Sequence, residues 1–366
     1  MFSSPLFRRY FLPGFVFQSV LIGGGYGTGR ELVEFFLSTG PLTGLLGMLV
    51  STLTWCLVCG VTFELARSAQ TYDYRSFSKF LLGRAWVLYE LYYLFALVLT
   101  LAVLGAAAGS ILTETFRLPY FLGVVIVMAA VAALVFKGSA AIERYLSLWS
   151  FVLYGIYVVL FCWTFSRFHS DIWSALASSE LNSGWFSAGL RYACYNVAVV
   201  PALLFSVRHI ETRREALTAG ILAGPIGIIP GVLFAFAMIA HYPLVVEQTV
   251  PANFVVGALD SNTFRLVFQI GLVGTLVETG GGFIHSFNER LSRSYAERGR
   301  TMPQKLRPVI GVVMLLVATA IAQLGLVELV AQGYGMLSWV ALCVYVIPVV
   351  TLGLWKLVLP TAARNP

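Results

Sequence analysis

The stretch LIGGGYGTGRELVEFF, residues Leu21–Phe36, decides the fold of this chain. Five of the seven residues from Gly23 to Gly29 are glycine, and Arg30 and Glu31 follow at once. A glycine inside a helix costs about 1 kcal/mol relative to alanine, and a charge at membrane depth costs several kcal/mol more. The stretch nevertheless lies inside the first long apolar segment, so both features need an explanation.

The composition places this segment in a membrane. Hydrophobic residues make up 58% of the 366 residues and charged residues only 11%, whereas soluble domains carry roughly 25% charged residues. So few charges cannot cover a water-facing surface. The chain is therefore expected to be an all-α polytopic membrane protein, and its aromatic residues, 14% of the total, suit interfacial belts.

Ten apolar segments have close to the ~20 residues that a helix needs to cross a bilayer. The expected spans are 10–38, 42–66, 86–112, 119–136, 145–166, 184–207, 215–240, 263–287, 307–325 and 328–357. With the N-terminus inside, 19 of the 24 lysines and arginines lie on the inner side and three on the outer side, while Arg30 and Arg191 lie at membrane depth. The positive-inside rule then predicts that both termini are cytoplasmic. The net charge of +7 reports this orientation and does not indicate a nucleic-acid partner.

The ten spans divide into two halves, about 10–167 and 184–358, within one transmembrane domain of residues 1–366. Each half has five crossings, so a shared fold would make the halves an inverted repeat. The sixth span is weakened near its middle, because Asn196 lies there and Pro201, which removes a backbone donor, follows. Breaks near the midplane of spans 1 and 6 are typical of a transporter binding site.

The glycine run has two explanations. Small residues permit close helix packing, and this accounts for two or three of the five glycines. Unwinding accounts for the whole run, because a bound ligand or ion can satisfy backbone groups that hydrocarbon cannot. The half-helix that begins near Gly27–Gly29 would then direct its positive end at the gap and stabilise an anionic group such as a carboxylate.

A ten-span chain with these two interruptions resembles the amino-acid–polyamine–organocation superfamily, which has the leucine-transporter fold. The motif IGGGYGTGRELVEFF is most similar to the short bacterial YkvI-like membrane proteins, which are largely uncharacterised. The resemblance implies a bacterial plasma membrane, a five-plus-five inverted repeat, a substrate held at unwound spans 1 and 6, and spans 3 and 8 beside it. The substrate contacts that we expect are Ile22, Gly23, Gly24, Gly25, Tyr26, Gly27, Tyr93, Tyr195 and Asn196.

The eighth span carries an ionisable residue at membrane depth, Glu278, in the sequence GTLVETGGGFIHSF. Thr275, Glu278 and Thr279 share one helix face because they are spaced i, i+3 and i+4. In sodium-coupled members of the superfamily, hydroxyls with this spacing and carbonyls of unwound helix 1 hold the ion. Thr275 and Thr279 match that pattern and Glu278 departs from it. Glu278 is a cation ligand, a proton carrier or a packing residue with a paired charge.

The resemblance also implies an outer gate closed by an ion pair. The candidate pairs are Arg30 with Glu328 and Glu31 with Arg191. Recognition of a substrate amine is the alternative for Glu31.

The function that these features favour is secondary active transport, as a symporter, of a small polar organic solute such as an amino acid or a related amine, driven by Na⁺ or H⁺. The sequence contains neither a nucleotide-binding loop nor HExxH, so we expect neither an ATP-driven pump nor an enzyme. Inorganic-ion transport is the main alternative, followed by a membrane sensor or scaffold. The five cysteines, Cys56 and Cys59 among them, are expected to pack without a metal centre. No cofactor beyond a bound Na⁺ is expected, and a monomer in the lipid bilayer would suffice.

Overall fold

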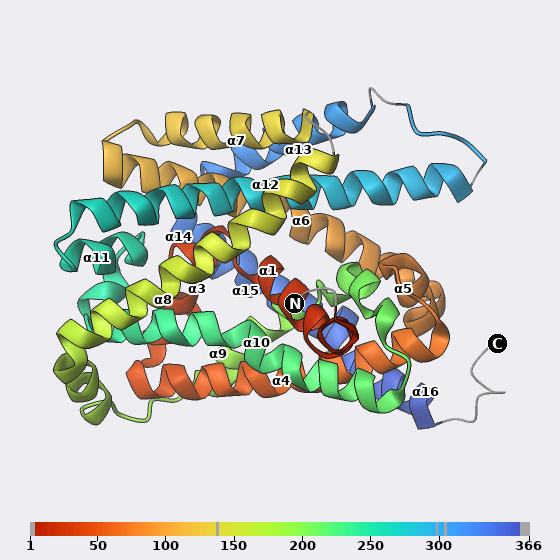
Figure 1. Cartoon of the computed structure of the whole chain (residues 1–366), viewed down its shortest axis with the longest axis horizontal. Helices are drawn as coiled ribbons and strands as arrows, with labels where there is room; N and C mark the ends of the chain where they lie inside the picture. Colours follow the sequence, from red (N-terminus) through yellow and green to blue (C-terminus); the bar gives the residue numbers. More distant parts are fainter. Residues whose placement is uncertain (1–3, 137–138, 298, 304–305, 359–366) are drawn as a thin grey trace.

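The computed structural model describes residues 4–136, 139–297, 299–303 and 306–358. In Figure 1 the long helices run mostly along one direction, with α11 at one end of the bundle and α5 and α16 at the other. These ends are called the α11 end and the α5 end below. Six of the basic residues that the sequence assigns to the inner side cannot be checked against the structure. Four of them lie outside the described residues, namely Lys137, Arg298, Lys305 and Arg364, and the side chains of Arg144 and Arg293 are not described.

The first half of the chain forms η1 (Phe7–Phe11), α1 (Leu12–Leu21), α2 (Gly24–Gly27), α3 (Arg30–Phe35), η2 (Leu37–Thr39), α4 (Pro41–Ala69), α5 (Tyr74–Leu82), η3 (Gly83–Ala85), α6 (Trp86–Phe116), α7 (Tyr120–Phe136) and α8 (Ser139–Ala177). The second half forms α9 (Trp185–Val197), η4 (Val200–His209), α10 (Arg213–Ile239), η5 (Leu244–Glu247), α11 (Pro251–Ala258), α12 (Asn262–Glu297) and α13 (Leu306–Ala322). The last predicted span forms α14 (Leu326–Glu328), η6 (Leu329–Tyr334), α15 (Gly335–Ala341), η7 (Leu342–Val346), η8 (Val349–Gly353) and α16 (Leu354–Val358).

Helical segments occupy each of the ten predicted ranges. By length and apolarity, five helical stretches of the described residues qualify as membrane spans, and the bent pair α9–η4 makes a sixth. The helices α7 and α13 are apolar but shorter. The all-helical membrane architecture is thus confirmed, and the count of ten crossings stays a prediction.

The outward faces of the helices are apolar, as lipid contact requires. On α4, Leu49, Leu53 and Leu57 are 54%, 61% and 52% exposed and recur every four residues, so they form one stripe along the helix. Such a stripe on a surface helix would be unfavourable in water and suits the hydrocarbon of a bilayer.

The first predicted span is interrupted twice. Helix α1 ends at Leu21, and Gly23 is fully extended (φ −106°, ψ −162°) before α2 begins. A second interruption follows at Gly29, whose φ of +81° is a left-handed conformation that glycine adopts without steric cost. The unwinding expected from the glycine run is therefore confirmed.

The sixth predicted span is also broken. Helix α9 ends at Val197, η4 starts at Val200, and the two segments meet at 64°. The bend comes just after the predicted centre at Asn196 and just before Pro201, which has no N–H for the hydrogen-bond ladder.

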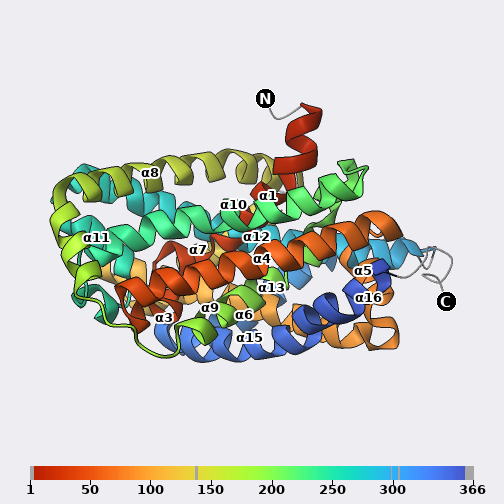
Figure 2. The same cartoon turned by 90° about the horizontal axis from the view of Figure 1, so that it is seen from below.

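Glycine pairs bring the helices around these breaks into close contact. A side chain on Gly189 of α9 would overlap the backbone at Gly47 of α4, and one on Gly220 of α10 would overlap that at Gly60. Helix α1 packs on α10, and α2 packs on α6 and α12. In Figures 1 and 2, α1 and α3 accordingly lie inside the bundle, while Figure 2 places α8 on one face and α15 and α16 on the opposite one.

The last predicted span is less regular than its sequence indicates. Its segments η6, η7 and η8 are π-helical, with wider turns than the α-helical segments beside them. Wider turns of this kind are frequent at functional sites, and η6 ends at Tyr334, which lines the cavity described next.

Candidate functional site

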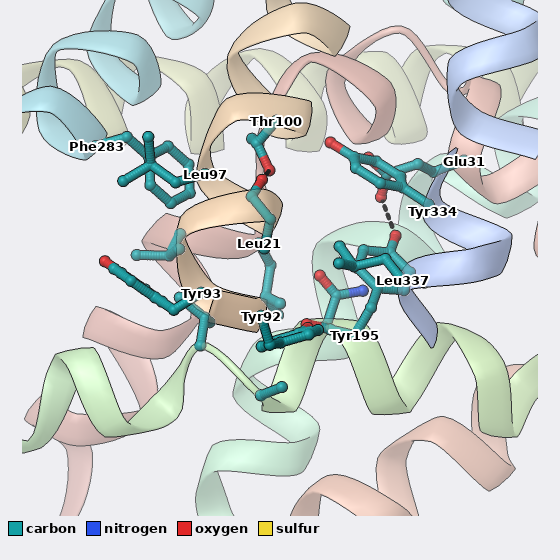
Figure 3. Close-up of a pocket in the computed structure, with 16 residues that line it drawn as sticks. Leu21, Glu31, Tyr92, Tyr93, Leu97, Thr100, Tyr195, Phe283, Tyr334 and Leu337 are labelled. Atoms are coloured by element: carbon teal, nitrogen blue, oxygen red, sulfur yellow. Dashed lines mark hydrogen bonds between the residues drawn. The ribbon is translucent and has the colours of Figure 1, made fainter. Parts of the chain in front are cut away.

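A cavity of about 60 Å³ lies beside both breaks. One water needs about 10–15 Å³ by this measure, so the cavity holds roughly four to six water-sized groups. Its walls come from α1 and the first break, α3, α6, α9 with the second break, α12, η6 and α15. Figure 3 shows side chains from these elements converging on the space.

Glu31 is the one carboxylate among the described residues that line this cavity. Its side chain is 3% exposed, and the Tyr195 hydroxyl donates a hydrogen bond of 2.6 Å to it (Figure 3). The ring of Tyr195 stacks on that of Tyr334, with centroids 4.9 Å apart and planes 21° from parallel. Three elements, α3, α9 and η6, thus meet at this carboxylate.

The Glu31 side chain also reaches back over the first break. A Cβ at Gly25 would overlap the carboxylate, so glycine is needed there for close approach. The sequence predicted that an anionic group would lie at the start of the segment after the break, and in the structure Glu31 itself supplies that group.

Helix α6 provides the aromatic wall opposite. Tyr92 and Tyr93 both line the cavity, and the Tyr92 hydroxyl donates to the Tyr195 carbonyl at 3.4 Å. Tyr93 stacks on Tyr74 of α5, with centroids 5.2 Å apart, so the wall continues to the α5 end. Thr100 lies seven residues after Tyr93 and also lines the cavity.

The structure brings together four of the expected substrate contacts, namely Gly23, Tyr93, Tyr195 and Asn196, on the cavity wall. The other five are not on it: Ile22, Gly24, Gly25, Tyr26 and Gly27. Gly24 faces α6 instead, and a Cβ there would lie 3.1 Å from the Cα of Leu104. Gly27 is similarly packed against Leu272. Packing thus explains these two glycines.

Eleven of the sixteen lining residues were not predicted, and four of these have polar or aromatic side chains: Tyr92, Thr100, Phe283 and Tyr334. Thr100 was recognisable, because it shares a helix face with Tyr93 at i+7. Tyr92 was recognisable as a neighbour of Tyr93 in the third span, whereas Phe283 and Tyr334 gave no signal of their own, since an aromatic residue in an apolar span packs in most cases.

The predicted ion-binding residues lie on α12 beside the first break. Thr275, Glu278 and Thr279 are all buried. The Thr279 hydroxyl donates to the Ile22 carbonyl at 3.3 Å, so a hydroxyl of α12 meets a carbonyl released by the break. The Thr275 hydroxyl instead bonds to the Gly271 carbonyl of its own helix at 2.9 Å.

Neither predicted gate pair forms in this structure. Arg30 pairs with Glu34 at 3.1 Å, and the carboxylate of Glu328 accepts from Gln332 at 2.7 Å. Glu31 bonds to Tyr195 as described, and the Arg191 guanidinium stacks on the ring of Phe35. Consecutive helical residues point about 100° apart, so with Glu31 turned into the cavity Arg30 must point elsewhere.

Contacts tie the bundle together at both ends of the cavity. At the α11 end, Arg30 donates to the carbonyls of Val246 and Gln248, and the Ala252 N–H donates to the Thr28 carbonyl at 2.9 Å. At the α5 end, Glu90 of α6 forms an ion pair with Arg290 of α12, whose guanidinium also lies over the Tyr74 ring.

The chain is similar to two proteins of Bacillus subtilis strain 168, while no protein-family model matches it. The uncharacterised membrane protein YkvI is 21% identical over 334 residues, which cover 90% of this chain and 92% of YkvI. The uncharacterised protein YyaD is 24% identical over 216 residues, which cover 57% of this chain and 60% of YyaD.

Solved transporters have the same architecture. A manganese transporter of Eremococcus coleocola matches with a TM-score of 0.59 and 17% identity, covering 93% of this chain and 78% of its own. MhsT in complex with L-phenylalanine matches with the same TM-score and identity, covering 93% and 86%. Mhp1, a nucleobase-cation-symport-1 family transporter, matches at 0.59 and 15% identity, covering 89% and 74%. The chain therefore has the leucine-transporter fold of these membrane transporters.

Proposed function

We propose that this protein is a secondary active transporter, a symporter of a small polar organic solute such as an amino acid or a related amine, coupled to Na⁺ or H⁺. The observation that carries the proposal is the position of the cavity beside both helix breaks, with Glu31, Tyr195 and Asn196 on its wall. In a membrane, broken helices near the midplane provide backbone and side-chain groups to a transported solute.

The contacts at the two ends suit alternating access. Opening toward the α11 side requires release of Arg30 from the carbonyls of Val246 and Gln248. Opening toward the α5 side requires separation of Glu90 and Arg290. Transport follows if one set of contacts opens while the other holds, as in the known closures around ligands.

Two groups beside the first break are candidates for coupling. The Thr279 hydroxyl and the Ile22 carbonyl are oxygen ligands from different elements, and hard cations take oxygen ligands. Na⁺ would replace the hydrogen bond between them. Glu278, one position before Thr279, is the candidate proton carrier or further cation ligand.

The cellular setting is part of the proposal. We place the protein in a bacterial plasma membrane with both termini cytoplasmic, supported by the relatives from Bacillus and by the excess of basic residues on one side. The halves 10–167 and 184–358 would form the inverted repeat of a single domain. The cavity is built within one chain, so a monomer suffices.

The experiment is uptake by purified protein in liposomes. Radiolabelled amino acids and amines are offered under an inward Na⁺ gradient and, separately, under an inward H⁺ gradient. We expect accumulation of at least one solute under one gradient, and its loss in Glu278→Gln. The control is Glu247→Gln, the same exchange on the exposed surface of η5. Failure of every solute under both gradients would refute the proposal, and accumulation of Mn²⁺ or another inorganic ion alone would establish the ion-transport alternative.

A further inference from the structure

The substrate class can be narrowed from the charges around the cavity, on the basis of the transport function proposed above. We infer that the cavity selects a small solute that carries a protonated amine and no neighbouring carboxylate, and that Glu31 is the residue that binds the amine. Three observations carry this inference: an uncompensated buried carboxylate, an anion position that the chain fills itself, and aromatic walls.

Glu31 brings a buried acid to the cavity, and it forms no ion pair with the residues that the structure describes. Its side chain accepts a hydrogen bond from the hydroxyl of Tyr195, a neutral donor. Among the described residues, no lysine, arginine or histidine lines the cavity, and the adjacent Arg30 pairs with Glu34. A buried charge is costly unless it is paired. A cationic group on the solute would form this pair with the Glu31 carboxylate.

The position for a solute carboxylate is already taken. The Glu31 carboxylate fills the space over Gly25 at the first break, where a Cβ would overlap it. A second carboxylate would meet Glu31 at close range as a like charge. An amine without a carboxylate is therefore favoured over a zwitterionic amino acid of the same size.

The remaining walls suit a cation as well. Tyr93, Tyr195 and Tyr334 line the space with aromatic rings, and those of Tyr195 and Tyr334 are stacked nearly parallel. Ring faces attract ammonium groups. With room for roughly four to six water-sized groups, the cavity in this structure fits a short aliphatic amine.

The test compares four probes that share a four-carbon chain and differ in charge: n-butylamine, 2-aminobutyrate, butyrate and butyramide. Thermal melting of the purified protein in detergent reports binding, because a ligand stabilises the folded state by RT ln(1 + [L]/Kd), so at equal concentration the probe with the lower Kd raises the melting temperature more. We expect n-butylamine to raise the melting temperature of the wild-type protein more than the other three. Glu31→Gln should weaken n-butylamine binding about 10- to 100-fold, the loss expected for a hydrogen bond to a charged group. Glu247→Gln should leave it unchanged.

The outcomes separate the two proposals. Stronger stabilisation of the wild type by 2-aminobutyrate or butyrate would overturn the inference and leave the transport proposal standing. Equal n-butylamine affinity in Glu31→Gln would do the same. If Glu31→Gln does not fold, the ranking of the four probes on the wild type decides. If the uptake experiment finds no transported solute of any charge, the transport proposal fails and the inference fails with it.

Discussion

Alanine at two adjacent glycines separates the packing role of the first break from its role in the cavity. At Gly24 the added methyl would lie 3.1 Å from the Leu104 Cα and 3.3 Å from the Ala107 Cβ. At Gly23 it would meet only the Thr279 Cγ2, at 3.8 Å, which is ordinary van der Waals contact. The Gly23 backbone is extended, a conformation that alanine adopts without strain.

The expected changes in the free energy of unfolding follow from these contacts. Both exchanges restrict the unfolded chain and gain about 0.4–1 kcal/mol from that, and this gain cancels when the two variants are compared. Overpacking against the backbone of α6 costs Gly24→Ala about 1–3 kcal/mol. Gly24→Ala should therefore be less stable than Gly23→Ala by about 1–3 kcal/mol.

The assay is denaturant unfolding of both variants in the same detergent, followed by tryptophan fluorescence. Transport is measured in parallel, and Gly23→Ala should impair it without loss of stability, because Gly23 lines the cavity of about 60 Å³. Equal stability of the two variants, or a less stable Gly23→Ala, would contradict the assignment of Gly24 to helix packing and of Gly23 to the cavity wall.

Three further changes test other parts of the structure. Gly25→Ala should displace the Glu31 carboxylate and lower solute affinity about as far as Glu31→Gln does, as measured by ligand-dependent melting. Unchanged affinity would contradict the close contact between the Glu31 carboxylate and the backbone at Gly25. Thr279→Val keeps the shape but removes the hydroxyl at the Ile22 carbonyl, and it should raise the Na⁺ concentration needed for half-maximal uptake at least tenfold if Na⁺ is the coupling ion. Burial lowers the pKa of His241, outside the spans, below its usual value near 6.5, opposed by the charge of Asp171. The unfolded chain then binds more protons as the pH falls through about 6.5, so stability is lost below that pH. His241→Phe, which keeps the ring packed on Phe168, should flatten the melting temperature between pH 7.5 and 5.5, and an equally steep profile would exclude His241 as the cause.

The positions of the two breaks were predictable because their causes are local. Glycines at 23–29 and Pro201 act through the backbone of their own segment, whatever packs around them. Tyr93 of α6 was also predictable as a candidate, because the resemblance placed the third span beside the substrate.

The direction of the charged side chains was not predictable. Arg30 and Glu31 are neighbours, and the contacts that hold them in opposite directions, with Val246 and Gln248 for Arg30 and with Tyr195 for Glu31, come from distant parts of the chain. The stacking of Tyr334 on Tyr195 likewise joins residues far apart in sequence. A single sequence carries no signal for such a contact.

The π-helical turn before Tyr334 has a consequence for how homologous chains should be compared. A π turn holds about one residue more than an α turn, so the same residues wound as an α-helix would turn Tyr334 by about 100° relative to the residues before the segment. Loss of one residue from segment 329–333 would restore α geometry and leave Tyr334 facing Tyr195, whereas α geometry at the present length would take the ring away from Glu31 and Tyr195. Alignments of homologous chains should therefore allow a gap of one residue in this segment, so that the residue matching Tyr334 is identified correctly.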